Sequence, residues 1–188
     1  YQLEKIRKKL ERESSSKNFL KSLNITVEFI KDFKNNLDRV YQLTNKTNQF
    51  NLTTERLEIN QIKNFHNKPN KKIIIVNAKD KYGDYGIISI VYLTISKNSF
   101  NINNWLMSCR VFNKTIENAI MYKLIQSMKR FNKKTLNLTF IRTKKNLLMI
   151  DLLKNLGFVE IKKVSNIKSQ WKLIEKNIKH ECKIKNEI

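Results

Sequence analysis

The sequence lacks most of the features that define fibrous, linker-like and membrane-spanning proteins. Its 188 residues include 3 glycines and 1 proline, too few for a collagen-like, proline-rich or Gly/Ser-linker architecture. The longest apolar run, residues 86–95, is half of the roughly 20 residues that a membrane-spanning helix needs. Tyr1 is neither a methionine nor followed by an apolar leader, so we expect the chain to be part of a longer protein. With 40% hydrophobic residues, it is expected to fold as one compact soluble domain.

Cysteine and arginine are also scarce. Cys109 and Cys182 lie far apart, which indicates neither a disulfide framework nor a zinc site, so we expect no metal and a cytoplasmic location. The net charge is +22, from 38 basic and 16 acidic residues. Because most of these basic residues are lysines spread along the chain, nucleic acid is disfavoured as a partner. The charge favours an acidic partner protein or a phosphorylated cofactor.

Hydrophobic periodicity predicts an α/β fold, a mixed sheet with helices on both faces. Strands are expected at residues 25–29, 72–78, 86–96, 102–112, 136–141, 158–164 and 169–174. Helices are expected at residues 35–44, 54–65, 116–128 and 147–156, after two helical pieces within residues 1–23. Residues 1–22 would then connect to an upstream domain, residues 23–175 would form the folded domain, and residues 176–188 would be a frayed polar tail.

The resulting order, β-αα-β-β-β-α-β-α-β-β, resembles the fold of the GCN5-related N-acetyltransferases (GNAT). Four runs narrow the resemblance: LTNKTNQFNLTT at 43–54, DKYGDYG at 80–86, WLMSCRV at 105–111 and LGF at 156–158. Together they resemble the C-terminal, acetyltransferase-like domain of FkbH-like proteins, over almost the whole chain. In that family the domain follows a haloacid-dehalogenase-type phosphatase domain, and the pair is associated with making a glyceryl thioester on an acyl carrier protein.

The resemblance implies a cofactor, two partners and a binding turn. The cofactor would be acyl-CoA or a phosphopantetheine thioester, and the partners would be an acyl carrier protein and an upstream phosphatase domain, whose aspartate-rich motif this chain lacks. The residues that would bind the cofactor are Ser108, Arg110, Val111, Asn113, Lys114 and Thr115. The family's Gly-Arg-Gly turn is Asn113-Lys114-Thr115 here, which weakens a pyrophosphate cradle because glycine permits close backbone approach. Lys114 can still contact a phosphate as a point charge.

Two residues are candidates for catalysis. Cys109 is expected near the end of the fourth strand, where Arg110 and a helix N-terminus would favour a nucleophilic thiolate. Alternatively it is a small buried residue, because positions 105, 107, 109 and 111 of a strand share one face. Neither His66 nor His180 is placed to serve it as a base. Asp84 is either a general base facing the cleft or an ordinary turn residue.

A dense polar segment and one helix start complete the candidates. Asn48, Gln49, Asn51, Thr53 and Thr54 either line an acceptor pocket or cap helices and fix a loop. Glu117 opens a helix, where a favourable interaction with the helix dipole is preferred over a catalytic role.

The leading hypothesis is an acyltransferase-type domain that handles an acyl thioester on a carrier protein. The alternative is a non-catalytic module that docks the carrier protein and presents its arm to the upstream phosphatase domain. A basic face with Lys114, Lys123, Lys129 and Arg130 would recognise the acidic carrier, unless these lysines merely fill exposed positions.

Overall fold

The computed structural model describes residues 16–175 and 177–186. Its strands are β1 (Thr26–Ile30), β2 (Lys71–Asp80), β3 (Gly83–Ile95), β4 (Ser99–Met107), β5 (Thr135–Ile141), β6 (Phe158–Lys163), β7 (Lys168–Leu173) and β8 (Lys183–Lys185). Its α-helices are α2 (Ser16–Leu23), α3 (Leu37–Lys46), α4 (Ile59–His66), α5 (Ile116–Arg130) and α6 (Leu148–Asn155). Short 3-10 turns lie at Lys34–Asn36 and Cys109–Val111. The predicted order of strands and helices is confirmed, and β8 is an addition to it.

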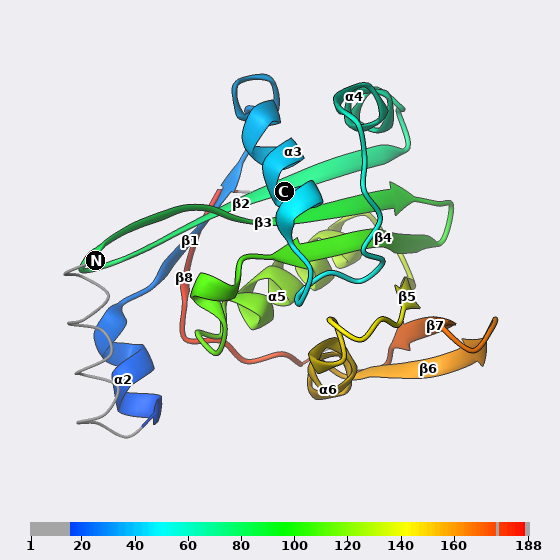
Figure 1. Cartoon of the computed structure of the whole chain (residues 1–188). Helices are drawn as coiled ribbons and strands as arrows, with labels where there is room; N and C mark the ends of the chain where they lie inside the picture. Colours follow the sequence, from blue (N-terminus) through cyan, green and yellow to red (C-terminus); the bar gives the residue numbers. More distant parts are fainter. Residues whose placement is uncertain (1–15, 176, 187–188) are drawn as a thin grey trace.

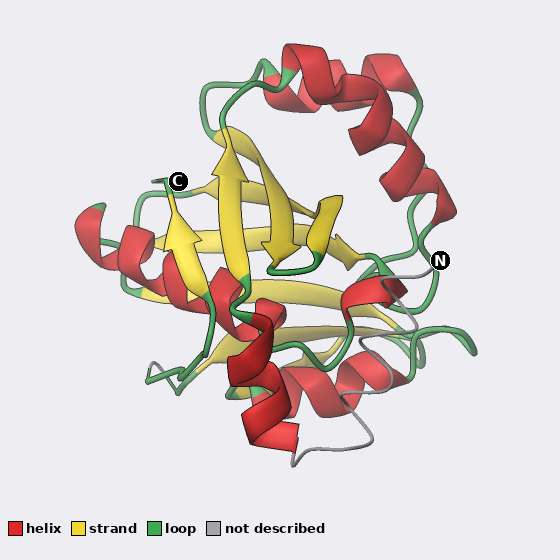
Figure 2. Ribbon diagram, turned by 90° about the vertical axis from the view of Figure 1, so that its left-hand side faces the viewer, coloured by secondary structure: helices red, strands yellow, loops and turns green. Residues whose placement is uncertain are grey.

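All eight strands form one mixed sheet in the order β6-β7-β5-β4-β3-β2-β1-β8. Neighbours are antiparallel except at β4–β5 and β1–β8, which are parallel. Helices α3 and α4 lie on one face and α5 lies on the other (Figures 1 and 2). The parallel β4–β5 pair is joined by α5, as a crossover connection requires.

The sheet buries a separate hydrophobic cluster on each face. Strand β2 shows why, because its side chains alternate between the faces. Ile73 and Ile75 pack in the cluster that contains Val40 and Leu43 of α3. Ile74 and Val76 face the larger cluster under α2, α5 and α6. Burial on both faces explains why β2 reads as a nearly continuous apolar run.

Two predicted boundaries are wrong, and each has a local cause. Helix α4 begins at Ile59 rather than near residue 54, because Glu58 and Gln61 form a reciprocal capping box there. Strand β4 ends at Met107 rather than near residue 112. After Ser108 donates its N–H to Ile88, the chain turns back on itself with the N–H of Val111 bonded to the carbonyl of Ser108.

Residues 177–186 are folded onto the domain, so the prediction of a frayed tail is wrong for this described part of it. Ile178 and Cys182 are buried, and β8 pairs with β1. The Nδ2 of Asn118 in α5 also donates to the carbonyl of Lys179 at 3.0 Å. At the other end, the predicted connector lies mostly outside the described residues, although Phe19 of α2 packs into the larger core. Among the described helices, none is long and apolar enough to cross a membrane.

Candidate functional site

Strands β4 and β5 separate partway along their length. Their last paired residues are Ile102 and Leu138. The next residue of β4, Asn103, is skipped in the register with β3, where Tyr92 pairs with Asn104 and Leu93 with Ile102. Such a bulge bends a strand and increases its twist. The second half of β4 therefore turns away from β5 and leaves its edge available for other partners.

The polar stretch between α3 and α4 fills this opening. We call residues 50–54 the inserted segment. The N–H of Leu52 donates to the carbonyl of Trp105 at 3.1 Å, and the N–H of Met107 donates to the carbonyl of Phe50 at 3.0 Å. On the other side, the N–H of Ile141 in β5 donates to the carbonyl of Leu52 at 2.9 Å. The inserted segment thus bridges β4 and β5 like a short extra strand.

Buried asparagines hold the inserted segment in place. The Nδ2 of Asn146, which is fully buried, donates to the carbonyls of Asn51 and Ile141, both at 2.9 Å. The Oδ1 of Asn51 accepts the N–H of Thr54 at 2.9 Å and that of Thr53 at 3.3 Å. Asn51, Thr53 and Thr54 therefore make the contacts expected of a fixed loop. Asn48 and Gln49, in contrast, line a pocket beside it.

Cys109 lies outside the core, on the 3-10 turn that follows β4. Its side chain is exposed, because the turn breaks the alternation that would have put it beside Trp105 and Met107. Of the two alternatives for Cys109, the small buried residue on a strand face is therefore wrong. Cys109 lines a pocket of about 950 Å³ between the C-terminal end of α3, the inserted segment and the end of β4.

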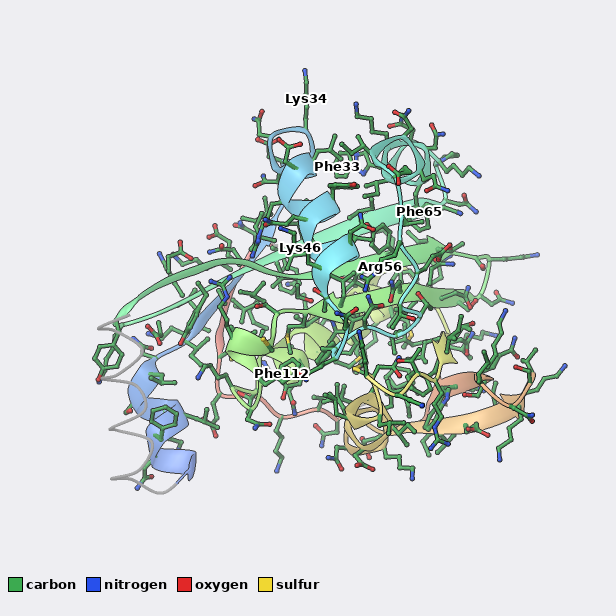
Figure 3. All side chains as sticks on the ribbon, viewed as in Figure 1. Phe33, Lys34, Lys46, Arg56, Phe65 and Phe112 are labelled. Carbon is green, nitrogen blue, oxygen red and sulfur yellow. The ribbon has the colours of Figure 1, made fainter. Side chains whose placement is uncertain are left out.

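This pocket, which we call the basic pocket, gathers positive charge. Its lining includes five cations, namely Arg39, Lys46, Arg110, Lys144 and Lys145, and no aspartate or glutamate. Ser108 also lines it, next to Cys109. Lys46 and Phe112, labelled in Figure 3, border the pocket from α3 and from the turn after β4. Burial and the nearby charge of Arg110 hold the pKa of Arg39 below its usual value.

A second pocket, of about 360 Å³, lies toward α5 and α6. It shares Phe50, Met107 and Phe112 with the basic pocket, so the two pockets adjoin at these residues, and together we call them the groove. Its other lining residues are Asn113, Glu117, Leu148, Asp151, Leu152 and Asn155. Because the only charged residues in this lining are Glu117 and Asp151, we call it the acidic pocket.

Glu117, for which the sequence favoured an interaction with the helix dipole, lies in a buried position beside the acidic pocket. Its side chain is 9% exposed, and its Oε2 is buried without a hydrogen-bond partner. Burial raises the pKa of this carboxyl above its usual value. Its place in the first turn of α5 fits a favourable interaction with the helix dipole, and its burial beside the acidic pocket is a further feature that this interaction does not require. The sequence signal for this burial was the position of Glu117 in the first turn of α5, one residue after the apolar Ile116.

The turn before α5, residues 113–115, has left-handed backbone at two positions. Asn113 has φ of 58° and Thr115 has φ of 56°. Asparagine tolerates this region, whereas β-branched threonine is strained in it. The turn therefore has left-handed residues although it contains no glycine. The side chain of Asn113 lines the acidic pocket.

Other predicted site residues lie outside the groove. Lys114 is buried with its Nζ 5.8 Å from the centre of the Phe19 ring, which is on the α2 side. Thr115 contacts the Sγ of Cys182 through its Oγ1 at 3.7 Å. Val111 is a fully buried core residue. Asp84 is exposed, and its Oδ1 accepts the N–H of Gly86 at 2.6 Å and the Nδ2 of Asn77 at 3.1 Å. Asp84 thus has the contacts of a turn residue and does not face the cleft.

The predicted basic face on α5 needs a similar correction. Lys114 and Lys123 are each only 9% exposed, so they cannot contribute to an open docking face. Lys129 and Arg130 are exposed at the C-terminal end of the helix. Positive charge gathers instead around Cys109. Across residues 16–175 and 177–186, no group of three or more His, Cys, Asp or Glu side chains is arranged to hold a metal ion.

Comparison with known proteins defines the class of fold. No protein-family model matches the chain, and no curated protein matches it in sequence. Among solved structures, the ribosomal-protein-S18-alanine N-acetyltransferase from Escherichia coli matches with a TM-score of 0.58 and 11% identity, over 79% of this chain and 92% of that one. Ard1 from Thermoplasma volcanium matches with a TM-score of 0.59 and 14% identity, over 81% and 99% of the chains.

A spermidine N-acetyltransferase from Vibrio cholerae, solved in complex with CoA and spermine, matches with a TM-score of 0.56 and 13% identity, over 80% of this chain and 95% of that one. The chain therefore has the fold of the GNAT N-acetyltransferases, as the order of its elements predicted.

Proposed function

We propose that this GNAT-like chain is an acyltransferase-type domain of the kind found in FkbH-like proteins, handling a glyceryl-type acyl thioester on an acyl carrier protein. The observation that carries the proposal is the exposed thiol of Cys109 in the basic pocket, at the end of β4. The partners would be an acidic carrier protein and an upstream haloacid-dehalogenase-type phosphatase domain, as the resemblance in residues 43–54 and 105–111 implies.

The chemistry open to Cys109 is thioester exchange. Its thiolate attacks the carbonyl carbon of the acyl thioester, a bond forms between that carbon and Sγ, and the bond to the sulfur of the arm breaks. The arm leaves as a thiolate and takes up a proton. Since the described lining of the basic pocket contains no His, Asp or Glu, protons would be exchanged with water. An incoming thiol then repeats the exchange in reverse and frees Cys109.

The residues at the start of α5 do not fit the pyrophosphate of CoA. A helix N-terminus is a suitable place for phosphate, but here Glu117 and Asp151 border it and Lys114 points toward α2. A carrier-bound arm has a single phosphodiester in place of this pyrophosphate. Both donors share the pantetheine, whose amides could not use the carbonyl of Trp105 or the N–H of Met107, because the inserted segment already uses them. We therefore favour a carrier-bound phosphopantetheine thioester over acyl-CoA as the substrate.

Mass spectrometry of the intact chain tests the proposal. After incubation with an acyl-phosphopantetheine carrier protein, we expect the mass to increase by one acyl group on Cys109, and acyl-CoA to label it more slowly. Cys109→Ala should abolish the label, whereas Cys182→Ala should retain it, because Cys182 is buried away from the groove. Absence of any acylated form with both donors would contradict the enzymatic role.

A non-catalytic docking module is the second candidate. The inserted segment favours it, because it closes the opening between β4 and β5 that would receive an arm. Isothermal titration with CoA, acyl-CoA and an acylated carrier protein distinguishes the two candidates. Binding of the carrier protein without transfer of the acyl group would support docking alone.

A further inference from the structure

We infer that the basic pocket is a binding site for the phosphate ester of the ligand that brings an acyl group to, or takes it from, Cys109. The inference rests on the proposed function for the identity of that ligand. The binding of phosphate itself rests on the charges and contacts of the pocket, and it can be tested without any reaction.

The positive charges of the basic pocket come from different parts of the fold. The five cations come from separate parts of the chain: Arg39 and Lys46 from α3, Arg110 from the turn after β4, and Lys144 and Lys145 from the turn after β5. The fold thus brings them to one opening although they are distant in sequence. Since the lining has no carboxylate, their repulsion is not offset by an acidic neighbour within it.

The two arginines of the basic pocket donate hydrogen bonds to neutral groups. Arg39 donates to the side chain of Gln42 and, at 3.2 Å, to the carbonyl of Ile87. Arg110 donates to the Oγ of Ser108 at 3.3 Å and to the carbonyl of Tyr85 at 3.2 Å. All four acceptors are neutral, so these bonds orient the guanidinium groups and leave their charge uncompensated. Each guanidinium has five N–H donors, so further donors remain for a planar or tetrahedral anion.

The two ends of the groove differ in the sign of their charge. Toward α5 and α6 the lining presents Glu117 and Asp151, and the middle is apolar, formed by Phe50, Met107 and Phe112. A ligand with one phosphate end would be repelled by the acidic pocket and attracted to the basic pocket. Phosphate would thus bind in the basic pocket, at the end of the groove away from the start of α5, and the arm would extend from it toward Cys109.

Equilibrium binding of three probes tests the inference, namely 4′-phosphopantetheine, pantetheine and inorganic pyrophosphate, each titrated by calorimetry at low salt. We expect 4′-phosphopantetheine to bind at least about tenfold more tightly than pantetheine, and high salt to reduce this difference because exposed charges are screened. If pyrophosphate binds as tightly as 4′-phosphopantetheine, the site takes a free phosphorylated ligand. If the pantetheine portion adds affinity, the site takes a phosphopantetheine arm, which a carrier protein and CoA share. Equal binding of 4′-phosphopantetheine and pantetheine, or no binding of any probe, would overturn the inference.

A pair of charge-matched variants locates the site. Lys144→Glu with Lys145→Glu should weaken binding of 4′-phosphopantetheine by about tenfold or more. Lys63→Glu with Lys68→Glu changes the net charge equally at exposed positions near α4, and binding should be unchanged. Thermal unfolding of both variants controls for folding. Equal weakening by the two pairs of substitutions would show a general charge effect and overturn the site. If the unsubstituted chain binds 4′-phosphopantetheine but Cys109 is never acylated, only the proposed function is contradicted.

Discussion

The two pockets of the groove differ in charge and exposure although they share three residues. The basic pocket has five cations and an exposed thiol, whereas the acidic pocket has two carboxyl groups, of which Glu117 is buried with an unpartnered oxygen. Phe50, Met107 and Phe112 form the boundary between them. The separation of β4 and β5 thus places two pockets of opposite charge next to each other. Substitutions in one lining can change that pocket without changing the other.

The largest expected difference between the two regions is in thiol reactivity. Cys109 borders the basic pocket and is exposed, whereas Cys182 lies under the start of α5. Burial raises the pKa of Cys182 from 9.0 to about 11, which reduces its thiolate fraction at neutral pH by about a hundredfold. In the folded protein, iodoacetamide should therefore alkylate Cys109 and spare Cys182, as peptide mass mapping would show. Equal labelling without denaturant would refute this assignment.

The next expected effect concerns the inserted segment, whose Phe50 lines both pockets. Asn146→Leu removes the donor that satisfies the carbonyls of Asn51 and Ile141. Leaving buried carbonyls without partners should lower the free energy of unfolding by about 2–4 kcal/mol, measured by urea denaturation. Asn64→Ala, at an exposed position of α4, is the control and should change it by less than about 0.5 kcal/mol. A similar small change for Asn146→Leu would mean that the inserted segment does not depend on this network.

Glu117 should make the acidic pocket sensitive to pH. Because burial raises its pKa in the folded state, the folded protein binds its proton more tightly than the unfolded chain does. Its contribution to stability is therefore complete below the usual value of 4.5 and is lost as the pH rises through the higher folded value. Glu117→Gln should equal the wild type in stability at low pH and exceed it increasingly toward neutral pH. Parallel pH profiles of the two melting temperatures would contradict this.

The smallest expected effect is at the turn before α5. Thr115→Gly should stabilise the protein by about 1 kcal/mol, because a β-branched residue is strained at φ of 56°. Asn113→Gly should give a smaller gain, since asparagine tolerates φ of 58°. Thermal unfolding of the two variants gives the comparison. A loss of stability for Thr115→Gly would show that the Thr115 contact with Cys182 outweighs the strain.

The sequence predicted those parts of the molecule that depend on local periodicity. The apolar run in residues 72–78, the alternation in residues 136–141 and the helical spacing in residues 116–128 were enough to predict the sheet, the crossover and the class of fold. The site depends on contacts between distant segments, such as Asn51 with Asn146 and Phe50 with Met107. No local pattern encodes these pairings, so the inserted segment, the burial of Glu117 and the two pockets could not be derived in advance.

The placement of Cys109 shows the same limit at a single residue. Periodicity extended the fourth strand through Phe112, but β4 ends at Met107, and the chain turns after Ser108 bonds to Ile88. A hydrogen-bond partner on β3 therefore decides the exposure of the thiol. The role of the thiol stays a prediction until acylation is measured.

Strand β8 has a consequence for solubility. Without it, β1 would present a row of free N–H and carbonyl groups, the kind of template on which further strands add during amyloid growth. β8 covers that row over Thr26–Glu28 and is itself only three residues long, with exposed Lys183 and Lys185 on either side of Ile184. A short, positively charged outer strand resists pairing with a second copy. Deleting residues 177–186 should therefore shorten the lag time of aggregation, in addition to exposing the core beneath Ile178 and Cys182.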